Sequence, residues 1–180
     1  MSKILLGITG SIAAYKACEL AGMLKKKGHV VKCAMTPDAS YFVTPLTMET
    51  ITGEKVADSL FRLPETRGPV HVSLADEAEL VLVAPATADI ICKTAAGICD
   101  DVLTCAICAT AAPVLFAPAM NNGMYSNPIL QDKIAYLKSK GHRFVGPVEG
   151  ALACGRVGMG HLAPLEEIVA EVERTIASLR

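Results

Sequence analysis

Charged residues are scarce in this sequence. They make up 19% of its 180 residues, whereas soluble domains commonly carry about 25%. The formal net charge at pH 7 is −1, and the longest basic run is the lysines at positions 25–27. Because a nucleic-acid interface needs concentrated positive charge, we predict that nucleic acid is not a partner. The apolar fraction of 52% suggests that some surface is buried in an oligomer or around a large ligand.

No charged residue occurs between positions 102 and 131, a span longer than the roughly 18 residues that indicate a transmembrane candidate. Prolines and the polar turn at Asn121–Gly123 interrupt this span, so we interpret it as buried helix, strand and loop. The beginning of the sequence lacks a signal-peptide pattern. We therefore expect a cytoplasmic protein without a membrane partner.

The cysteines lack the spacing of a disulfide framework or a metal site. There are seven, an odd number, and Cys105 and Cys108 form a C-x-x-C pair inside an apolar helical pattern. No second pair and no histidine stands at ligand spacing from them. We predict reduced thiols packed in the core, and no metal centre.

The first strand-to-helix turn lacks the glycine pattern of a dinucleotide site. The strand pattern begins at Lys3 and reads Gly7-x-x-Gly10-Ser11 at its end, and no acidic residue closes the second strand. NAD is therefore disfavoured. Gly10 would allow a close backbone approach, and Ser11 would cap a helix whose N-terminal N–H groups face an anion. These features favour a mononucleotide phosphate, although glycines at this place also occur simply as turn residues.

The rest of the sequence alternates strand patterns with helix patterns. Strand patterns cover residues 29–35, 80–84, 114–117 and 143–145. One of the intervening helices is predicted to begin after Thr44 and to end at Gly53. His29 is expected at the surface, and residues 54–70 are expected to be irregular. The alternation predicts one domain over residues 1–180 with an α/β fold, a single doubly wound parallel sheet in a Rossmann-like (flavodoxin-like) three-layer sandwich.

Polar and small residues follow several of the predicted strands. Thr36, Ser40 and Thr44 lie after the second strand, at the sheet edge where ligands bind, although helix capping also explains them. Small residues at 85–89 would let a flat ring lie close to the backbone. Residues 149–160 contain four glycines and are predicted to form a lid over the site.

Five motifs, taken together, resemble the homo-oligomeric flavin-containing cysteine decarboxylases over nearly the whole chain. They are Gly10–Lys16, His71, Pro85–Asp89, Pro118–Asn121 with Met124–Tyr125, and Ala153–Gly155. The resemblance implies FMN and a trimer-based assembly, a homotrimer or a dodecamer, with the active site at a subunit contact. It also implies that FMN is lined by Gly10, Ser11, Thr36, Phe42, Pro85, Ala86, Thr87, Ala88 and Asp89.

The reaction implied by the resemblance is the decarboxylation of phosphopantothenoylcysteine to phosphopantetheine in coenzyme A biosynthesis. The cysteine is oxidised to a thioaldehyde with the help of FMN, carbon dioxide leaves, and the resulting enethiol is reduced again. His71 is then the base that activates the thiol, and Cys154 is the acid that protonates the enethiol. Asn121 holds the substrate carboxylate with Met120 beside it, and Ala153 and Gly155 also contact the substrate.

Two other readings remain open. A peptidyl-cysteine decarboxylase would share His71 and Asn121 but would not need Cys154 as a proton donor. A flavin-binding regulatory subunit without catalytic activity is the other alternative, and the joint presence of these three residues argues against it. Arg156 stands where the family commonly has an aspartate, which leaves the substrate contacts of the lid open. We expect the synthetase activity that joins cysteine to phosphopantothenate to come from a separate polypeptide.

Overall fold

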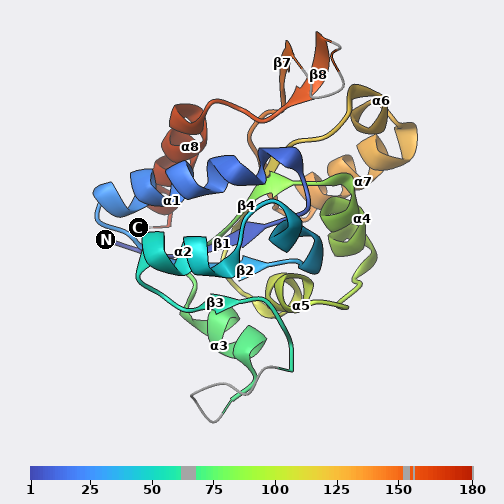
Figure 1. Cartoon of the computed structure of the whole chain (residues 1–180). Coiled ribbons are helices and arrows are strands. Elements are labelled where there is room, and N and C mark those ends of the chain that lie inside the picture. The colour runs from blue at the N-terminus through green and yellow to red at the C-terminus, as the bar shows by residue number, and fades with distance from the viewer. Residues whose placement is uncertain (62–67, 152–154, 156, 180) are drawn as a thin grey trace.

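A parallel sheet of six strands forms the centre of the fold in the computed structural model, which describes residues 1–61, 68–151, 155 and 157–179 (Figure 1). The strand order is β3-β2-β1-β4-β5-β6, and every neighbouring pair is parallel. This confirms the predicted doubly wound α/β fold. The strands are β1 (Lys3–Ile8), β2 (Val30–Met35), β3 (Val56–Ala57), β4 (Leu80–Ala86), β5 (Val114–Pro118) and β6 (Arg143–Phe144).

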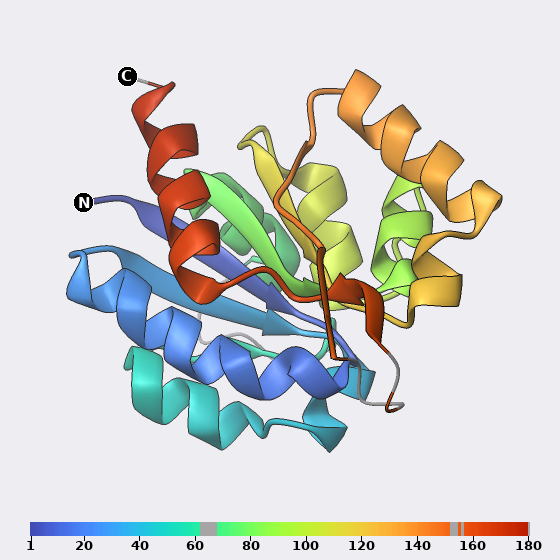
Figure 2. The ribbon, with the colours of Figure 1, turned by 90° about the horizontal axis from the view of Figure 1, so that it is seen from above.

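Helices cover both faces of the sheet and complete three layers (Figures 1 and 2). One face packs against α1 (Lys16–Lys26), α2 (Pro45–Thr52) and α8 (Leu165–Ala177). The other packs against α3 (Val70–Glu77), α4 (Ala88–Ala96), α5 (Val102–Ala109) and α7 (Pro128–Ser139). Short helical turns follow three strands: η1 (Ile12–Tyr15), η2 (Pro37–Tyr41) and α6 (Asn122–Tyr125).

The central strands are buried on both faces, which explains why their sequence is apolar without alternation. All seven residues of β4 are buried, and in β1 only Lys3 is exposed. Gly7 of β1 lies against α5, since a Cβ atom there would come within 2.6 Å of the Leu103 side chain. Glycine therefore allows the helix to approach the middle of the sheet.

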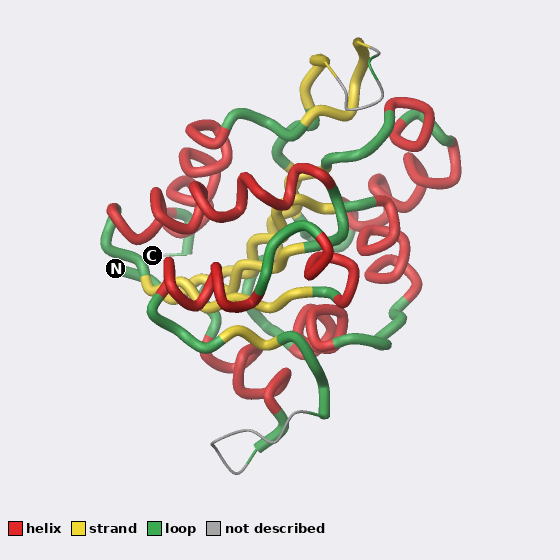
Figure 3. Tube along the Cα trace, viewed as in Figure 1, coloured by secondary structure: helices red, strands yellow, loops and turns green. Residues whose placement is uncertain are grey.

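The glycine-rich segment forms a small antiparallel hairpin that projects from the body of the domain (Figures 1 and 3). Its strands are β7 (Val148–Ala151) and β8 (Val157–His161). The sequence predicted a lid here but no strands. The tip of this hairpin lies outside the described residues, apart from Gly155.

Three local predictions were wrong. His29 is buried, and its Nε2 atom lies 2.8 Å from Oε1 of Glu173. Cys108 is exposed and Cys105 is only half-buried, because α5 turns Val102, Leu103, Ala106 and Ile107 toward the core instead. The short strand β3 lies in a segment predicted to be irregular.

Within the described residues, no helix combines the length and the apolar character needed to cross a membrane.

Candidate functional site

The site begins where β1 and β4, adjacent in the sheet, lead to connections on opposite sides of it. Such a topological switch point is where open α/β sheets bind ligands, outside the carboxyl ends of the strands. The turns after β1, β2 and β4 meet at this edge (Figure 2). All of the residues predicted to line the cofactor lie in these turns, at the end of β4 or in the first turn of α4.

The turns after β1 and β2 lie in direct contact. A Cβ atom at Gly10 would lie 2.5 Å from that of Asp38, so only glycine permits this approach. The sequence attributed the need for Gly10 to an approaching ligand, and the structure adds this contact between the two turns. Ser11 caps η1 as predicted, with its Oγ accepting a hydrogen bond of 3.3 Å from the Ala13 N–H.

Thr36 presents a buried hydroxyl at this edge. Its backbone N–H donates to the Ile8 carbonyl over 3.0 Å, which ties β2 to the end of β1. Its Oγ1 atom is buried and has no hydrogen-bond partner among the described residues. Since a buried hydroxyl normally has a partner, this atom marks a place for a polar ligand group. Phe42 follows at the end of η2, with its ring exposed beside the turn.

The turn after β4 ends in the N-terminus of α4. Pro85 and Ala86 are buried, whereas Thr87 and Ala88 are partly exposed. Oγ1 of Thr87 caps α4 by accepting from the Ile90 N–H over 3.4 Å. The helix therefore directs its positive end toward the switch point, where the small residue Ala88 is partly exposed.

Asp89, in the first turn of α4, already has a cationic partner. Its carboxylate lies 3.2 Å from Nζ of Lys93, which is also 3.1 Å from Asp100. Burial alone would lower the pKa of Lys93, but hydrogen bonds to Asp100 and Asp89 outweigh it and raise the pKa. Asp89 is therefore held on the side of α4, with its carboxylate neutralised by Lys93.

Sequence reasoning missed Thr9, the residue between β1 and Gly10. Its buried hydroxyl donates to the Pro85 carbonyl over 2.7 Å and accepts from the Thr87 N–H over 3.2 Å. The only local signal was a polar residue at the end of an apolar strand. Its two partners stand 76 and 78 positions away, beyond the reach of any local pattern.

The predicted substrate residues Met120 and Asn121 lie directly after β5. Asn121 caps α6, with Oδ1 accepting from the Gly123 N–H over 2.8 Å. The Met120 N–H donates to the carbonyl of Gly160 in β8 over 3.0 Å, so the hairpin is docked on this turn. Gly155 lies between β7 and β8, whereas Ala153, Cys154 and Arg156 lie outside the described residues.

His71, the predicted base, does not lie at this edge beside Asn121. It lies in the first turn of α3, half-buried, and its Nδ1 atom is buried without a hydrogen-bond partner among the described residues. Helix α3 packs on α5, α5 on α4, and α4 on α7, which carries α6 beside it. Figure 1 shows α3 on the opposite side of the domain from α6 and the hairpin.

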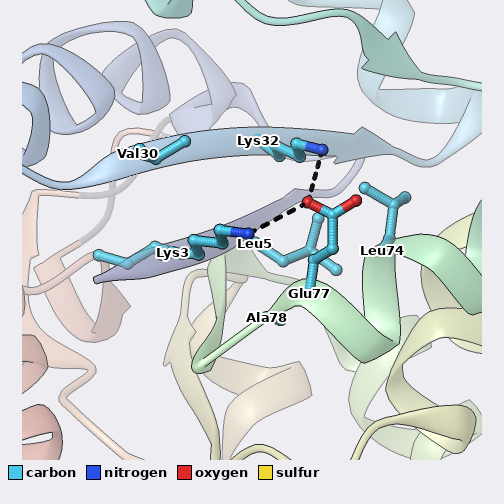
Figure 4. Close-up of a pocket in the computed structure, with 8 residues that line it drawn as sticks. Lys3, Leu5, Val30, Lys32, Leu74, Glu77 and Ala78 are labelled. Atoms are coloured by element: carbon cyan, nitrogen blue, oxygen red, sulfur yellow. Dashed lines mark hydrogen bonds and ion pairs between the residues drawn. The ribbon is translucent and has the colours of Figure 1, made fainter. Parts of the chain in front are cut away.

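A separate small cavity lies at the other end of the sheet, between the start of β1, the start of β2 and α3 (Figure 4). Its volume of about 30 Å³ would hold about two water molecules. Lys32 and Lys3 approach the Glu77 carboxylate there, at 2.9 and 3.7 Å. This ion-pair cluster is distant from the strand carboxyl ends and plays no part in the candidate site.

Comparisons with known proteins agree with the geometry. The family model described as Flavoprotein matches residues 1–177. A relative from Streptococcus mutans named probable phosphopantothenoylcysteine decarboxylase is 40% identical, over 97% of this chain and 98% of its own length. The coenzyme A biosynthesis bifunctional protein CoaBC of Vibrio cholerae is 47% identical over 97% of this chain, which spans only 44% of that protein.

Solved structures give the same picture. A PPC decarboxylase mutant complexed with pantothenoylaminoethenethiol superposes with a TM-score of 0.87 at 27% identity, covering 96% of this chain and 97% of the other. The FMN-dependent cysteine decarboxylase SpaF superposes with a TM-score of 0.86 at 28% identity, covering 98% of both chains. The family model matches nearly the whole chain, and the Streptococcus mutans relative aligns over nearly its whole length. These two matches show that this chain belongs to the Flavoprotein family.

Proposed function

We propose that this protein is an FMN-dependent decarboxylase that converts phosphopantothenoylcysteine into phosphopantetheine in coenzyme A biosynthesis. The observation that carries the proposal is the meeting of two sets of residues at one sheet edge. The turns at Gly10–Ser11, Thr36 and Pro85–Thr87 border the Met120–Asn121 turn, on which the hairpin is docked. The names of the relatives support the substrate and the cofactor, because both FMN and this decarboxylation occur among them.

The residues present at the switch point fit FMN. The unpartnered Thr36 hydroxyl offers a hydrogen bond, and the N-terminus of α4 favours a negatively charged or electron-rich group. Ala88 is small enough to leave space for a flat ring. When bound, FMN would supply a reversible two-electron acceptor for the cysteine carbon.

Asn121 is proposed to hold the carboxylate that is lost. Its Oδ1 atom accepts from the Gly123 N–H, which fixes the orientation of the amide, and the amide Nδ2 of an asparagine is a hydrogen-bond donor suited to a carboxylate. Cys154 lies in the sequence between β7 and β8, outside the described residues. We assign its thiol the role of proton donor to the enethiol.

His71 is proposed to act on the site of a neighbouring subunit. The distance of α3 from α6 within one chain supports this, as does the unpartnered Nδ1 atom. Exposed aromatic rings also support an assembly, since Tyr41 is 86% exposed and Phe61 is 91% exposed. We infer a homotrimer or a dodecamer built from trimers, with the active site at a contact between subunits.

Two expectations about the cellular context belong to the same proposal. We propose that a synthetase joining cysteine to phosphopantothenate supplies the substrate. We also propose that both reactions take place in the cytoplasm.

The proposal is tested by incubating the purified protein, loaded with FMN, with phosphopantothenoylcysteine and following the products by mass spectrometry. We expect carbon dioxide and phosphopantetheine. A peptide ending in cysteine, assayed in parallel, should react far more slowly. Release of an enethiol from the peptide, without turnover of phosphopantothenoylcysteine, would favour the peptidyl-cysteine decarboxylase. Tight FMN binding without turnover of either compound would favour a regulatory subunit.

A further inference from the structure

Thr9 joins the two strands that flank the switch point. Its side chain is buried, with 1% of the residue exposed, and both capacities of its hydroxyl are used. It donates to the Pro85 carbonyl over 2.7 Å and accepts from the Thr87 N–H over 3.2 Å. One hydroxyl therefore holds both ends of the segment Pro85–Thr87, where β4 ends and α4 is about to begin.

The hydrogen bonds of the Thr9 hydroxyl lie beyond the last paired residues of β1 and β4. The regular pairing of β1 with β4 ends at Gly7 and Val83. The pairing of β4 with β5 shifts its register between Val83 and Ala86, and the Ala86 carbonyl then accepts from the Ala119 N–H over 3.0 Å. The turn is therefore tied to β5 on one side, and the Thr9 hydroxyl ties it to β1 on the other.

Thr9 also shapes the turn on its own side. The Ser11 N–H donates to the Thr9 carbonyl over 2.8 Å, which tightens the backbone around Gly10. The residue thus holds Gly10–Ser11 through its carbonyl and Pro85–Thr87 through its side chain. A change in its side chain would alter the spacing between the two turns while leaving the residues of both turns intact.

We propose that Thr9 is a positioning residue that fixes the two halves of the FMN cradle at their binding distance before the cofactor arrives. This inference rests on the proposed function, because it assumes that these turns bind FMN. Preorganised sites bind more tightly, since less ordering remains to be done on binding. Loss of the hydroxyl would also leave the Thr87 N–H and the Pro85 carbonyl without their partner.

The test measures FMN affinity on three variants of the apoprotein, by titration and quenching of flavin fluorescence. Thr9→Val keeps the shape but removes the hydroxyl, and we expect FMN to bind about 10-fold more weakly than to wild type. Thr9→Ser keeps the hydroxyl and should stay within about 3-fold of wild type. Thr175→Val is the matched control, because Thr175 is also buried but lies in α8 near Arg143, at the amino end of β6. Its affinity should be unchanged.

Hydrogen exchange provides a second test that needs no variant. If Thr9 organises the cradle in advance, the Thr87 amide is protected in the wild-type apoprotein and not only after FMN is added. Rapid exchange of that amide in the apoprotein would overturn the inference, even if Thr9→Val failed to fold. Equal FMN affinity of Thr9→Val and wild type, or equal loss in Thr9→Ser and Thr9→Val, would overturn it as well. A wild-type protein that binds no FMN would instead contradict the proposed function.

Discussion

The docking of the hairpin on the Met120–Asn121 turn depends on Gly160, and Gly160→Ala tests it. Gly160 has a φ of +142°, a region that residues with a side chain rarely adopt. A Cβ atom there would lie 2.2 Å from the Met120 carbonyl oxygen, a backbone atom that cannot rotate away. The carbonyl of Gly160 in turn accepts a hydrogen bond from the Met120 N–H over 3.0 Å. The backbones of Gly160 and Met120 are therefore in direct contact.

The size of the effect follows from these distances. Real Cβ atoms essentially never approach closer than 3.0 Å, so the hairpin and the turn must separate by about 0.8 Å. The unusual φ adds strain of about 1–3 kcal/mol, which also favours undocking. A displacement of about 1 Å in a catalytic arrangement can reduce turnover about 100-fold. Since no residue of β8 belongs to the described hydrophobic cores, global stability should change little.

The assay compares kcat for phosphopantothenoylcysteine, FMN affinity and the melting temperature in Gly160→Ala and a control. We expect roughly 100-fold lower kcat with FMN affinity within about 3-fold of wild type. Gly28→Ala is the matched control, because Gly28 has a φ of +87° but an added Cβ meets nothing within 4 Å. It should lose about 1 kcal/mol of stability and keep its kcat. A Gly160→Ala protein with wild-type kcat would refute the role of the docked hairpin.

Three other predictions concern the acid, the subunit contact and the ion-pair cluster. Cys154→Ser should still bind FMN and release carbon dioxide but accumulate the enethiol, detected by mass as a product two hydrogens lighter; normal phosphopantetheine at the wild-type rate would exclude Cys154 as the acid. His71→Asn and Asn121→Ala should each be inactive alone. Oligomers assembled from a random mixture of the two variants should regain about one quarter of wild-type activity, because about one site in four would combine an intact His71 from one subunit with an intact Asn121 from the other. No recovery on mixing would place both residues in one chain. Glu77→Gln should lower thermal stability near neutral pH by less than about 1 kcal/mol, since the pair is partly exposed. The hydrogen bond from Lys32 lowers the pKa of Glu77 below its usual 4.5, so the ionised Glu77 stabilises the fold fully above pH 4.5. The melting temperatures of wild type and Glu77→Gln should therefore converge as the pH falls through the lowered pKa.

The central sheet could be predicted from the sequence because its signals are local. Strand β4 is a continuous apolar run, as buried parallel strands are, and its position followed directly. Helix α2 begins after Thr44, whose side chain caps it, and ends at Gly53 with a φ of +73°. The carboxyl ends of parallel strands share one edge, so the turns that carry the candidate cofactor residues could be placed together before any coordinates were known.

The remaining features depend on partners that are distant in the sequence. His29 was placed at the surface because it begins a strand, but its side chain is buried and its Nε2 atom lies 2.8 Å from the partly exposed carboxylate of Glu173, 144 positions later. The hairpin strands β7 and β8 have too many glycines for a strand pattern, and they are stabilised by pairing with each other and by docking on Met120. In α5 nearly every residue is apolar, so periodicity could not identify the face that leaves Cys108 exposed.

Within one chain, His71 is too far from Asn121 to act on a substrate held there. A base must come within about 3 Å of the proton that it removes. Packed helices lie about 8–10 Å apart, and in the described residues α3 is linked to α6 through α5, α4 and α7 in turn, so more than one helix spacing separates α3 from α6. No histidine side chain spans that gap from α3 to a substrate held at Asn121. The resemblance that assigns His71 as the base therefore requires a second copy of the chain, whose α3 must approach the first copy from outside. The exposed aromatic rings of Tyr41 and Phe61 offer apolar surface for such a contact.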